Sequence, residues 1–298
     1  MKKILILILA LLLLTVASGC GNRTEKSASG DGTLRIVTSF YPMYIDTINV
    51  TKGVDGVTVT NMTKPQTGCL HDYQLTTEDM KILERADIFV VNGAGMESFL
   101  DNVIKNRHSL IVVDASKNIP LMEEDGEPNP HVWLSVPASI AQVKNITKQL
   151  QDADPAHAEQ YQANCDAYVA KLEELNSEMH AKLDNVAHRD IVTFHEAFPY
   201  FARDFNLNIV SVIEREPGSD PSPADLEITI RQIRELPHTA LFAEPQYSPA
   251  AAETISRETG MPLYSLDPVV TGESVPEAAD EYLTRMRQNA EILYEALN

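Results

Sequence analysis

Residues 154–186 read DPAHAEQYQANCDAYVAKLEELNSEMHAKLDNV, a stretch with no glycine and a single proline, Pro155. Apolar side chains recur in this stretch at spacings of three and four, as on one face of an α-helix: Tyr161, Cys165, Tyr168, Leu172, Leu175, Met179, Leu183 and Val186. Pro155 suits the first turn of such a helix, and Asp154 suits its N-cap. About 32 residues at 1.5 Å each give a length of roughly 48 Å, more than one domain is wide. We therefore predict one long helix, and favour it over a helical hairpin broken near Glu173, because no turn residue follows that position until Asn176.

Short β-branched runs alternate with helical patterns on both sides of this helix, which is typical of an α/β fold with mainly parallel sheets. Four runs precede the helix and four follow it, at 34–38, 57–60, 87–91, 110–113, 190–194, 208–213, 239–243 and 263–266. We predict two lobes, each built on a mainly parallel four-stranded sheet and joined by the long helix. The expected parts are an N-terminal α/β lobe at 33–153, a linking helix at 154–187 and a C-terminal α/β lobe at 188–298.

The composition narrows the class of protein further. The chain of 298 residues has 24 Lys and Arg against 43 Asp and Glu, a formal net charge of −19, and 44% of its residues are hydrophobic. These proportions exclude a disordered or collagen-like chain, and the length suits two domains. So negative a surface repels phosphate backbones and attracts cations, so we expect no binding to nucleic acid.

The N-terminus has the features of a secretory signal. Lys2 and Lys3 precede an apolar run at 4–16 that is too short to span a bilayer comfortably. Ala-Ser-Gly-Cys at 17–20 resembles the lipobox of bacterial lipoproteins, which implies a signal peptide at 1–19 and a lipidated Cys20. A plain secretory signal is the alternative, since Ala17 stands where Leu is more common. Residues 20–32 are polar and rich in Gly and Ser, as in a flexible tether. We expect a protein anchored by lipid to the extracytoplasmic face of the cell membrane.

Four candidate metal ligands lie at strand ends or in loops. Ligand sites in α/β folds gather beyond the carboxyl ends of strands, and His195 and Asp267 follow predicted strands of the second lobe. His71 and His131 lie in loops of the first lobe. Three imidazoles and one carboxylate suit a tetrahedral Zn²⁺ site whose affinity falls as the pH drops through the histidine range near 6.5. Each histidine taken alone also fits a hydrogen-bonded loop residue, so residue types alone leave the site a hypothesis.

A set of short motifs carries a family resemblance. In chain order they are GCLHDY at 68–73, TEDM at 77–80, AD at 86–87, NGAGME at 92–97, NPHVWL at 129–134, HEAFPYF at 195–201, FAEPQ at 242–246 and LDP at 266–268. Together they make the chain from Thr33 to Asn298 resemble the solute-binding receptors of zinc and manganese ABC importers, the ZnuA/TroA-like family.

The resemblance implies a fold of two α/β lobes joined by one long helix, with the metal ion buried between the lobes. It places the metal ligands at His71, His131, His195 and Asp267. It also implies a monomeric receptor that captures Zn²⁺ and hands it to an ABC permease driven by a cytoplasmic ATPase. A manganese or mixed receptor is the alternative. His195 favours zinc, because manganese receptors of the family tend to carry Glu there and nitrogen ligands prefer Zn²⁺.

Several positions depart from the family pattern. Leu70 and Asn129 stand where Pro and Asp are common before the first two histidines, and Pro199 stands where Gly is usual. Zinc receptors often carry a long His-rich loop before the second ligand, whereas the stretch at 122–128 is short and acidic. We interpret that stretch as a solvated loop in preference to a low-affinity cation lure.

Four other side chains lie in or beside the motifs. Cys69 suits an accessory ligand or a redox-sensitive thiol, although the sequence favours a packed, inert cysteine. Trp133 and Phe198 are expected to form an apolar shell that excludes water from the metal. Glu244 is interpreted as a group that supports a ligand or packs between the lobes.

Two other classes of protein are alternatives to a metal receptor. A zinc hydrolase needs an open coordination position and a general base, and the His-Glu-x-x-His motif is broken because Pro199 occupies the place of its second histidine. Four protein ligands close a metal site, which suits carriage, so we expect no enzyme. An adhesin is the second alternative, since the family has attracted that label, but long exposed aromatic or repeat segments are absent from the sequence.

Overall fold

The computed structural model describes residues 32–70, 73–107, 109–124, 126–213, 222–236 and 239–298. The expected signal peptide at 1–19, the lipidation site Cys20 and the candidate ligand His71 therefore lie outside the described residues. Leu34–Asn298 forms one compact unit. None of the helices in the described ranges combines the length and apolar character that crossing a membrane requires.

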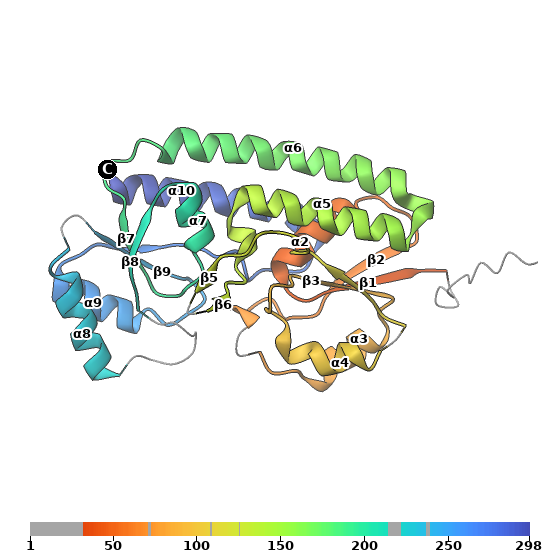
Figure 1. Ribbon diagram of the computed structural model, residues 1–298, viewed down its shortest axis with the longest axis horizontal. Helices are drawn as coiled ribbons and strands as arrows, with labels where there is room; N and C mark the ends of the chain where they lie inside the picture. The colour runs from red at the N-terminus through yellow and green to blue at the C-terminus, as the bar shows by residue number, and fades with distance from the viewer. Residues whose placement is uncertain (1–31, 71–72, 108, 125, 214–221, 237–238) are drawn as a thin grey trace, which may run out of the picture. The chain divides into compact units, whose positions relative to one another are not determined.

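The N-terminal lobe is built on a four-stranded parallel sheet with the order β2-β1-β3-β4. Its strands are β1 (Leu34–Thr38), β2 (Val57–Asn61), β3 (Ile88–Val91) and β4 (Ile111–Asp114). All four side chains of β3 are buried, as expected for a central parallel strand covered on both faces. Helices α3 and α4 lie on one side of this sheet (Figure 1). The helices and 3₁₀ turns of this lobe are α2 (Tyr41–Val50), α3 (Thr77–Glu84), η2 (Ser98–Leu100), α4 (Asp101–Lys105), η3 (Val132–Leu134) and α5 (Val136–Ala153).

The C-terminal lobe repeats this plan with a parallel sheet in the order β10-β9-β7-β8. Its strands are β7 (Asp190–Thr193), β8 (Asn208–Val212), β9 (Ala240–Ala243) and β10 (Leu263–Ser265). The helices of this lobe are α7 (Pro199–Asp204), α8 (Pro223–Ile233), α9 (Ala250–Thr259), the 3₁₀ turn η5 (Pro276–Asp280) and α10 (Glu281–Leu297). The predicted class, two four-stranded parallel sheets joined by a long helix, is confirmed. The exact domain boundaries remain predictions.

The predicted long helix is α6 (Ala158–Leu183), preceded by the 3₁₀ turn η4 (Pro155–His157). Every side chain of the predicted apolar stripe is buried. Figure 1 shows α6 running alongside α5 and α10, and it packs against both of them and against α2. Burying a large apolar side chain contributes about 1.5–3 kcal/mol, so this stripe is a main source of cohesion between the lobes.

Asp154 occupies the N-cap position of η4, but its side chain makes no capping hydrogen bond. Its carboxylate accepts a hydrogen bond from Tyr161 Oη at 2.7 Å and lies 2.7 Å from His157 Nδ1. The tight turn of η4 brings these two partners to the carboxylate, which therefore caps no backbone N–H of the helix.

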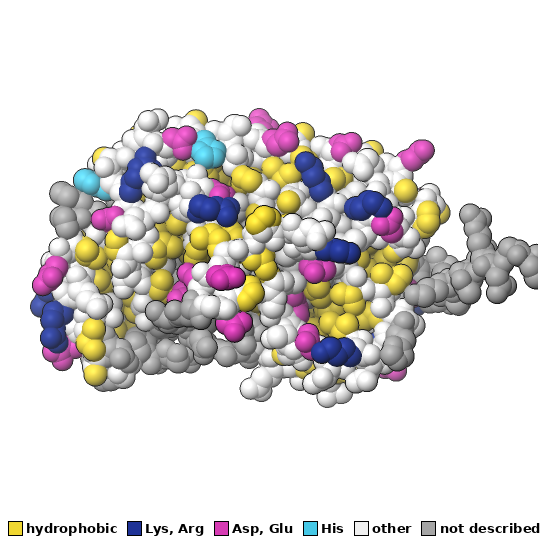
Figure 2. Space-filling view, in the orientation of Figure 1, with side chains coloured by type: hydrophobic (Ala, Val, Ile, Leu, Met, Phe, Trp, Pro, Cys, Tyr) yellow, Lys and Arg dark blue, Asp and Glu magenta, His cyan; other side chains and the backbone are white. Residues whose placement is uncertain are grey.

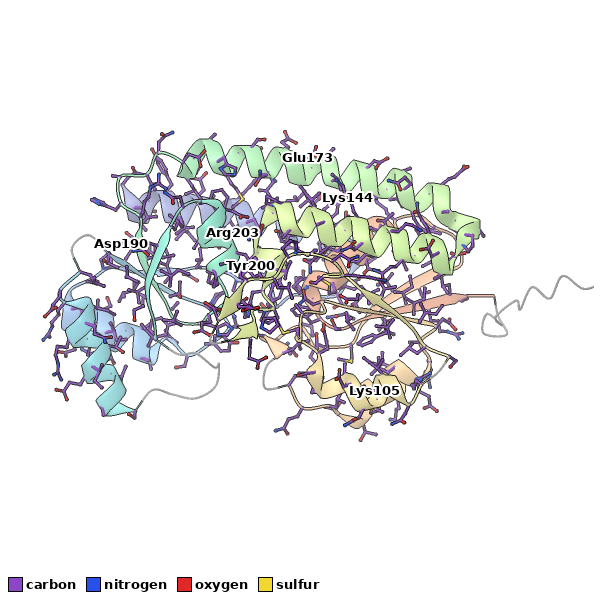
Figure 3. All side chains as sticks on the ribbon, viewed as in Figure 1. Lys105, Lys144, Glu173, Asp190, Tyr200 and Arg203 are labelled. Atoms are coloured by element: carbon purple, nitrogen blue, oxygen red, sulfur yellow. The ribbon has the colours of Figure 1, made fainter. Side chains whose placement is uncertain are left out.

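The acidic stretch at 122–128 was expected to be a loop and instead forms a short antiparallel ribbon. Strand β5 (Glu123–Glu124) pairs with β6 (Glu127–Pro128), and the turn between them contains Gly126 at φ 87°. Such a positive φ favours glycine, which explains the residue at this turn. Figure 3 shows Tyr200 and Arg203 on α7 next to this ribbon. Tyr200 Oη accepts the Met122 N–H and donates to the Asn129 carbonyl, both at 2.8 Å, so it clamps the base of the ribbon.

The last two helical elements tie the C-terminal lobe back to the N-terminal one. Asn49 of α2 donates through Nδ2 to the Ala279 carbonyl at 2.8 Å. Tyr282 of α10 donates through Oη to the Trp133 carbonyl at 2.7 Å. Because Trp133 is buried against Phe40, with their ring centroids 5.1 Å apart, these bonds fix η3 and the loop before it. That loop carries one of the candidate metal ligands.

Candidate metal centre

His131 lies in the loop between β6 and η3, and its side chain is 1% exposed. Asn129 Oδ1 accepts the His131 backbone N–H at 2.9 Å and lies 3.0 Å from His131 Nδ1. Asn129 Nδ2 donates to the Glu196 carbonyl at 2.9 Å and to the Glu124 carboxylate. Two acceptors at Nδ2 fix the orientation of the amide, so Oδ1 is the atom that faces the ring. His131 therefore carries its proton on Nδ1, and its Nε2 has a lone pair available for a metal ion.

His195 approaches His131 from the C-terminal lobe. It follows β7 by two residues and is 2% exposed, so its place beyond the carboxyl end of that strand is the one the sequence predicts. Its Nε2 lies 3.1 Å from His131 Nε2, and the two rings meet edge to face at 80°. The structure thus brings together two of the four predicted ligands, one from each lobe.

Cys69 is the third side chain at this point. Its Sγ lies 3.6 Å from His131 Nε2, and the residue is 8% exposed. Burial, with the nearby Glu244 carboxylate, raises the pKa of the Cys69 thiol well above its usual range, so the thiol is protonated in the metal-free protein. In the described part of the chain, the ligand atoms of Cys69, His131 and His195 form a group within 4.8 Å of one another.

Asp267 occupies a neighbouring but separate position after β10. Its Oδ1 accepts the Val269 N–H at 2.7 Å, and its Oδ2 lies 3.2 Å from Arg285 Nη1. The group of close ligand atoms found among the described residues does not include this carboxylate. The backbone beside it still contacts the centre, because Trp133 Nε1 donates to the Pro268 carbonyl at 2.8 Å.

Trp133, one of the two side chains expected to form an apolar shell, lies beside a histidine of the centre. The Trp133 ring lies 5.2 Å from the His131 ring, and Phe198 is buried after His195 on the way into α7. Glu244 is buried at the end of β9 and accepts a hydrogen bond from Gln246 Nε2. Excluding water in this way strengthens electrostatic interactions with a bound cation.

The NGAGME motif at 92–97 holds the loop that carries His131 in place through hydrogen bonds. Asn92 Nδ2 donates to the Pro130 carbonyl at 2.9 Å, next to His131. Glu97 accepts hydrogen bonds from Ser39 Oγ at 2.7 Å, from the Asn92 N–H at 2.8 Å and from the Gly93 N–H at 3.1 Å. Burial nevertheless raises the pKa of the Glu97 carboxyl to about 7. Gly93 is required here, because at its φ of 77° a Cβ would lie 2.1 Å from Asp114 Oδ1.

Asn129, Tyr200 and Tyr247 support the centre in ways the sequence did not predict. Asn129 was noted only as a departure from the family pattern, and Tyr200 only as part of a motif. Tyr247 Oη accepts the Cys69 backbone N–H at 3.4 Å. The position of Asn129 two residues before His131 is the one signal that pointed to any of them, because that spacing suits a side chain that bonds a nearby ring.

Two parallel α/β lobes that each contribute a buried histidine to one centre are the features to compare with known proteins. The chain matches the family model described as "Zinc-uptake complex component A periplasmic", ZnuA, over residues 36–296, and it belongs to that family.

Three similar proteins illustrate the range of the family. The high-affinity zinc uptake system protein ZnuA of Bacillus subtilis is 31% identical over 303 residues, covering 95% of this chain and 94% of the relative. The zinc-binding protein AdcA of Streptococcus pyogenes is 30% identical over 322 residues, 98% of this chain, which spans only 61% of that longer relative. The structure of the SBP FpvC from Pseudomonas aeruginosa in complex with Mn²⁺ aligns with a TM-score of 0.80 at 32% identity, covering 89% of this chain and 98% of FpvC.

Proposed function

We propose that this chain is the extracytoplasmic receptor of a high-affinity ABC importer, which captures Zn²⁺ between its lobes and delivers it to a membrane permease and its ATPase. The observation that carries the proposal is the 3.1 Å approach of Nε2 of His131 to Nε2 of His195, inside a buried centre shared by both lobes. An ion held there bridges the lobes, so a permease that moves one lobe relative to the other can open the site.

The proposed ligands are His71, His131, His195 and Asp267. His71 lies two residues beyond Cys69, whose sulfur is already beside His131, and this proximity in sequence supports its inclusion. Asp267 is supported by the bond from Trp133 to the adjacent Pro268 carbonyl. Its carboxylate would have to leave Arg285 and turn toward the histidines when the ion binds.

Zinc is the proposed ion and manganese the alternative. Imidazole nitrogens favour Zn²⁺ over the harder Mn²⁺, and the relatives ZnuA and AdcA are named for zinc. The complex of FpvC with Mn²⁺ keeps the alternative open. A net charge of −19 favours the approach of either cation, and the acidic side chains on the face in Figure 2 are interspersed with basic ones.

The proposal also includes a lipid anchor in the membrane and the absence of enzymatic activity. Lipidation at Cys20 would hold the receptor at the extracytoplasmic face of the membrane, and relatives named as lipoproteins support this location. The family is one of solute-binding receptors, and closing the site with four protein ligands leaves no position for a hydrolytic water. The monomeric state and a secondary adhesin role remain predictions.

The test is a competition between Zn²⁺ and Mn²⁺ on the purified, metal-stripped full chain in detergent, with the bound metal counted. We expect one tightly bound zinc that is lost in His195→Ala and retained in His188→Ala, a change in a histidine outside the centre. At a thousandfold excess over Kd, zinc should stabilise the fold by about 4 kcal/mol. Preferential binding of manganese would change the transported ion, and the absence of any tight metal would refute the function.

A further inference from the structure

The proposed ligand set contains only nitrogen and oxygen, yet the thiol of Cys69 lies among the histidines. We propose that Cys69 supplies a sulfur ligand to the captured metal ion and thereby sets its preference for zinc over manganese. This inference rests on the proposed function, since it adds a fifth ligand to the four proposed for the same site and makes the bound zinc five-coordinate.

Two of the distances between the ligand atoms match those that zinc bonds impose. Zn–N bonds of about 2.0–2.1 Å and Zn–S bonds of about 2.3 Å at tetrahedral angles place two nitrogens about 3.3 Å apart and a nitrogen and a sulfur about 3.5 Å apart. The observed separations are 3.1 Å between Nε2 of His131 and Nε2 of His195, and 3.6 Å between Nε2 of His131 and Sγ of Cys69. These two separations suit one ion between His131 and each neighbour, and the ligand atoms of all three residues lie within 4.8 Å of one another.

The backbone holds the sulfur at this place. Cys69 donates its N–H to Tyr247 Oη at 3.4 Å, a contact from the loop after β9 in the opposite lobe. The preceding residue is Gly68, where a Cβ would lie 3.0 Å from the same hydroxyl oxygen. Tyr247 thus packs directly on the Gly68–Cys69 backbone, and the thiol is positioned from both lobes, as the two histidines are.

Cys165 shows how a packed cysteine differs from Cys69. It lies on the buried apolar face of α6, among the leucines and tyrosines of that helix. The sulfur of Cys69 contacts an imidazole nitrogen whose lone pair is directed into the centre. Both cysteines are buried, but only Cys69 lies beside potential metal-ligand atoms in the described part of the chain.

A sulfur donor changes which ions the site prefers. Binding of the ion releases the proton of the Cys69 thiol to solvent. The resulting thiolate is a soft ligand that suits Zn²⁺ and discriminates against Mn²⁺, whose preferred ligands are carboxylates, carbonyls and water. Replacing the sulfur by a hydroxyl should therefore weaken zinc far more than manganese. We expect the loss for zinc to exceed the roughly 10–100-fold that removing a hydrogen-bonding partner of a ligand costs.

The experiment loads the full chain in detergent with Co²⁺, a spectroscopic substitute for Zn²⁺, and records its absorption. Wild type and Cys165→Ser should show a sulfur-to-cobalt charge-transfer band in the near ultraviolet, and Cys69→Ser should lack it. Competition titrations with Zn²⁺ and Mn²⁺ on the same three proteins should show a lower zinc-to-manganese preference in Cys69→Ser alone.

The outcomes separate this inference from the proposed function. One bound cobalt without a charge-transfer band in wild type would overturn the sulfur ligand and leave the receptor intact. A band that persists in Cys69→Ser, or an unchanged ion preference, would overturn the assignment to Cys69. A wild-type chain that binds none of the three ions would overturn both proposals. The wild-type spectrum decides the sulfur ligand even if the serine variant folds poorly.

Discussion

The amide oxygen of Asn129 lies 3.0 Å from Nδ1 of His131 and thereby assigns the proton of that imidazole. The opposite nitrogen then faces the centre with its lone pair, as a metal ligand must. Where other receptors of the family commonly have Asp, this chain has a neutral amide, so the hydrogen bond orients the ring without adding a negative charge.

Asn129→Ala removes this orientation and should lower the affinity for zinc by about 10–100-fold, the usual loss when a ligand histidine loses its hydrogen-bonding partner. Isothermal titration with Zn²⁺ measures the change. Asn145→Ala is the matched control, because Asn145 Nδ2 likewise donates to two acceptors, which are the carbonyls of Ala115 and Lys117. Equal affinities in the two variants would mean that Asn129 does not orient the ligand.

Asp267→Asn tests whether the carboxylate joins the histidines. We expect at least about a tenfold weaker binding of zinc, because the amide cannot supply an anionic oxygen ligand. Its lost contact with Arg285 is partly exposed, so the unfolding free energy of the metal-free protein should change by less than about 1 kcal/mol.

Asp280→Asn is the control for Asp267, since it removes an exposed ion pair with Lys171. Wild-type affinity in Asp267→Asn would remove this residue from the site. A large loss of stability in the metal-free variant would instead assign it a structural role through the Val269 N–H.

The fold could be predicted because its signals are local. The apolar stripe of α6 repeats every three or four residues, and the eight strands are short β-branched runs bounded by polar residues. Strands β5 and β6 have two residues each, too few to show any periodicity, so the acidic ribbon could not be recognised. It depends on Gly126 and on the clamp from Tyr200.

The site was only partly predictable for a related reason. His131 and His195 were chosen for their places in a loop and at a strand end, and the fold brings them together. The proximity of Cys69 to His131 depends on Tyr247, which is 178 residues away in the chain. No spacing rule connects such residues, and the pairing of His71 with this centre stays a prediction.

Tyr200→Phe should destabilise the metal-free protein by about 1–2 kcal/mol. The hydroxyl bonds both the Met122 N–H and the Asn129 carbonyl, and its loss leaves these groups without that partner. Urea denaturation measures the change. Tyr294→Phe removes a hydroxyl from a side chain that is 47% exposed and should have little effect. Equal stabilities of the two variants would show that the clamp contributes nothing.

Glu97 should make the stability of the metal-free protein depend on pH. Its folded pKa of about 7 lies above the ordinary value of 4.5, so the native state binds the proton more tightly than the unfolded state. Stability from this group is therefore complete below about pH 4.5 and is lost as the pH rises through 7, by on the order of 3 kcal/mol in total.

Glu97→Gln cannot titrate, so the difference in unfolding free energy, wild type minus variant, should fall as the pH is raised from 5 to 8. Urea denaturation at each pH, with the metal removed, gives this difference, and the titration of the histidines cancels between the two proteins. Exposed Glu295 provides the control, because Glu295→Gln should follow the wild type at every pH. A difference for Glu97→Gln that is constant with pH would show that the carboxyl keeps its ordinary pKa, and that its three hydrogen bonds offset the cost of burial.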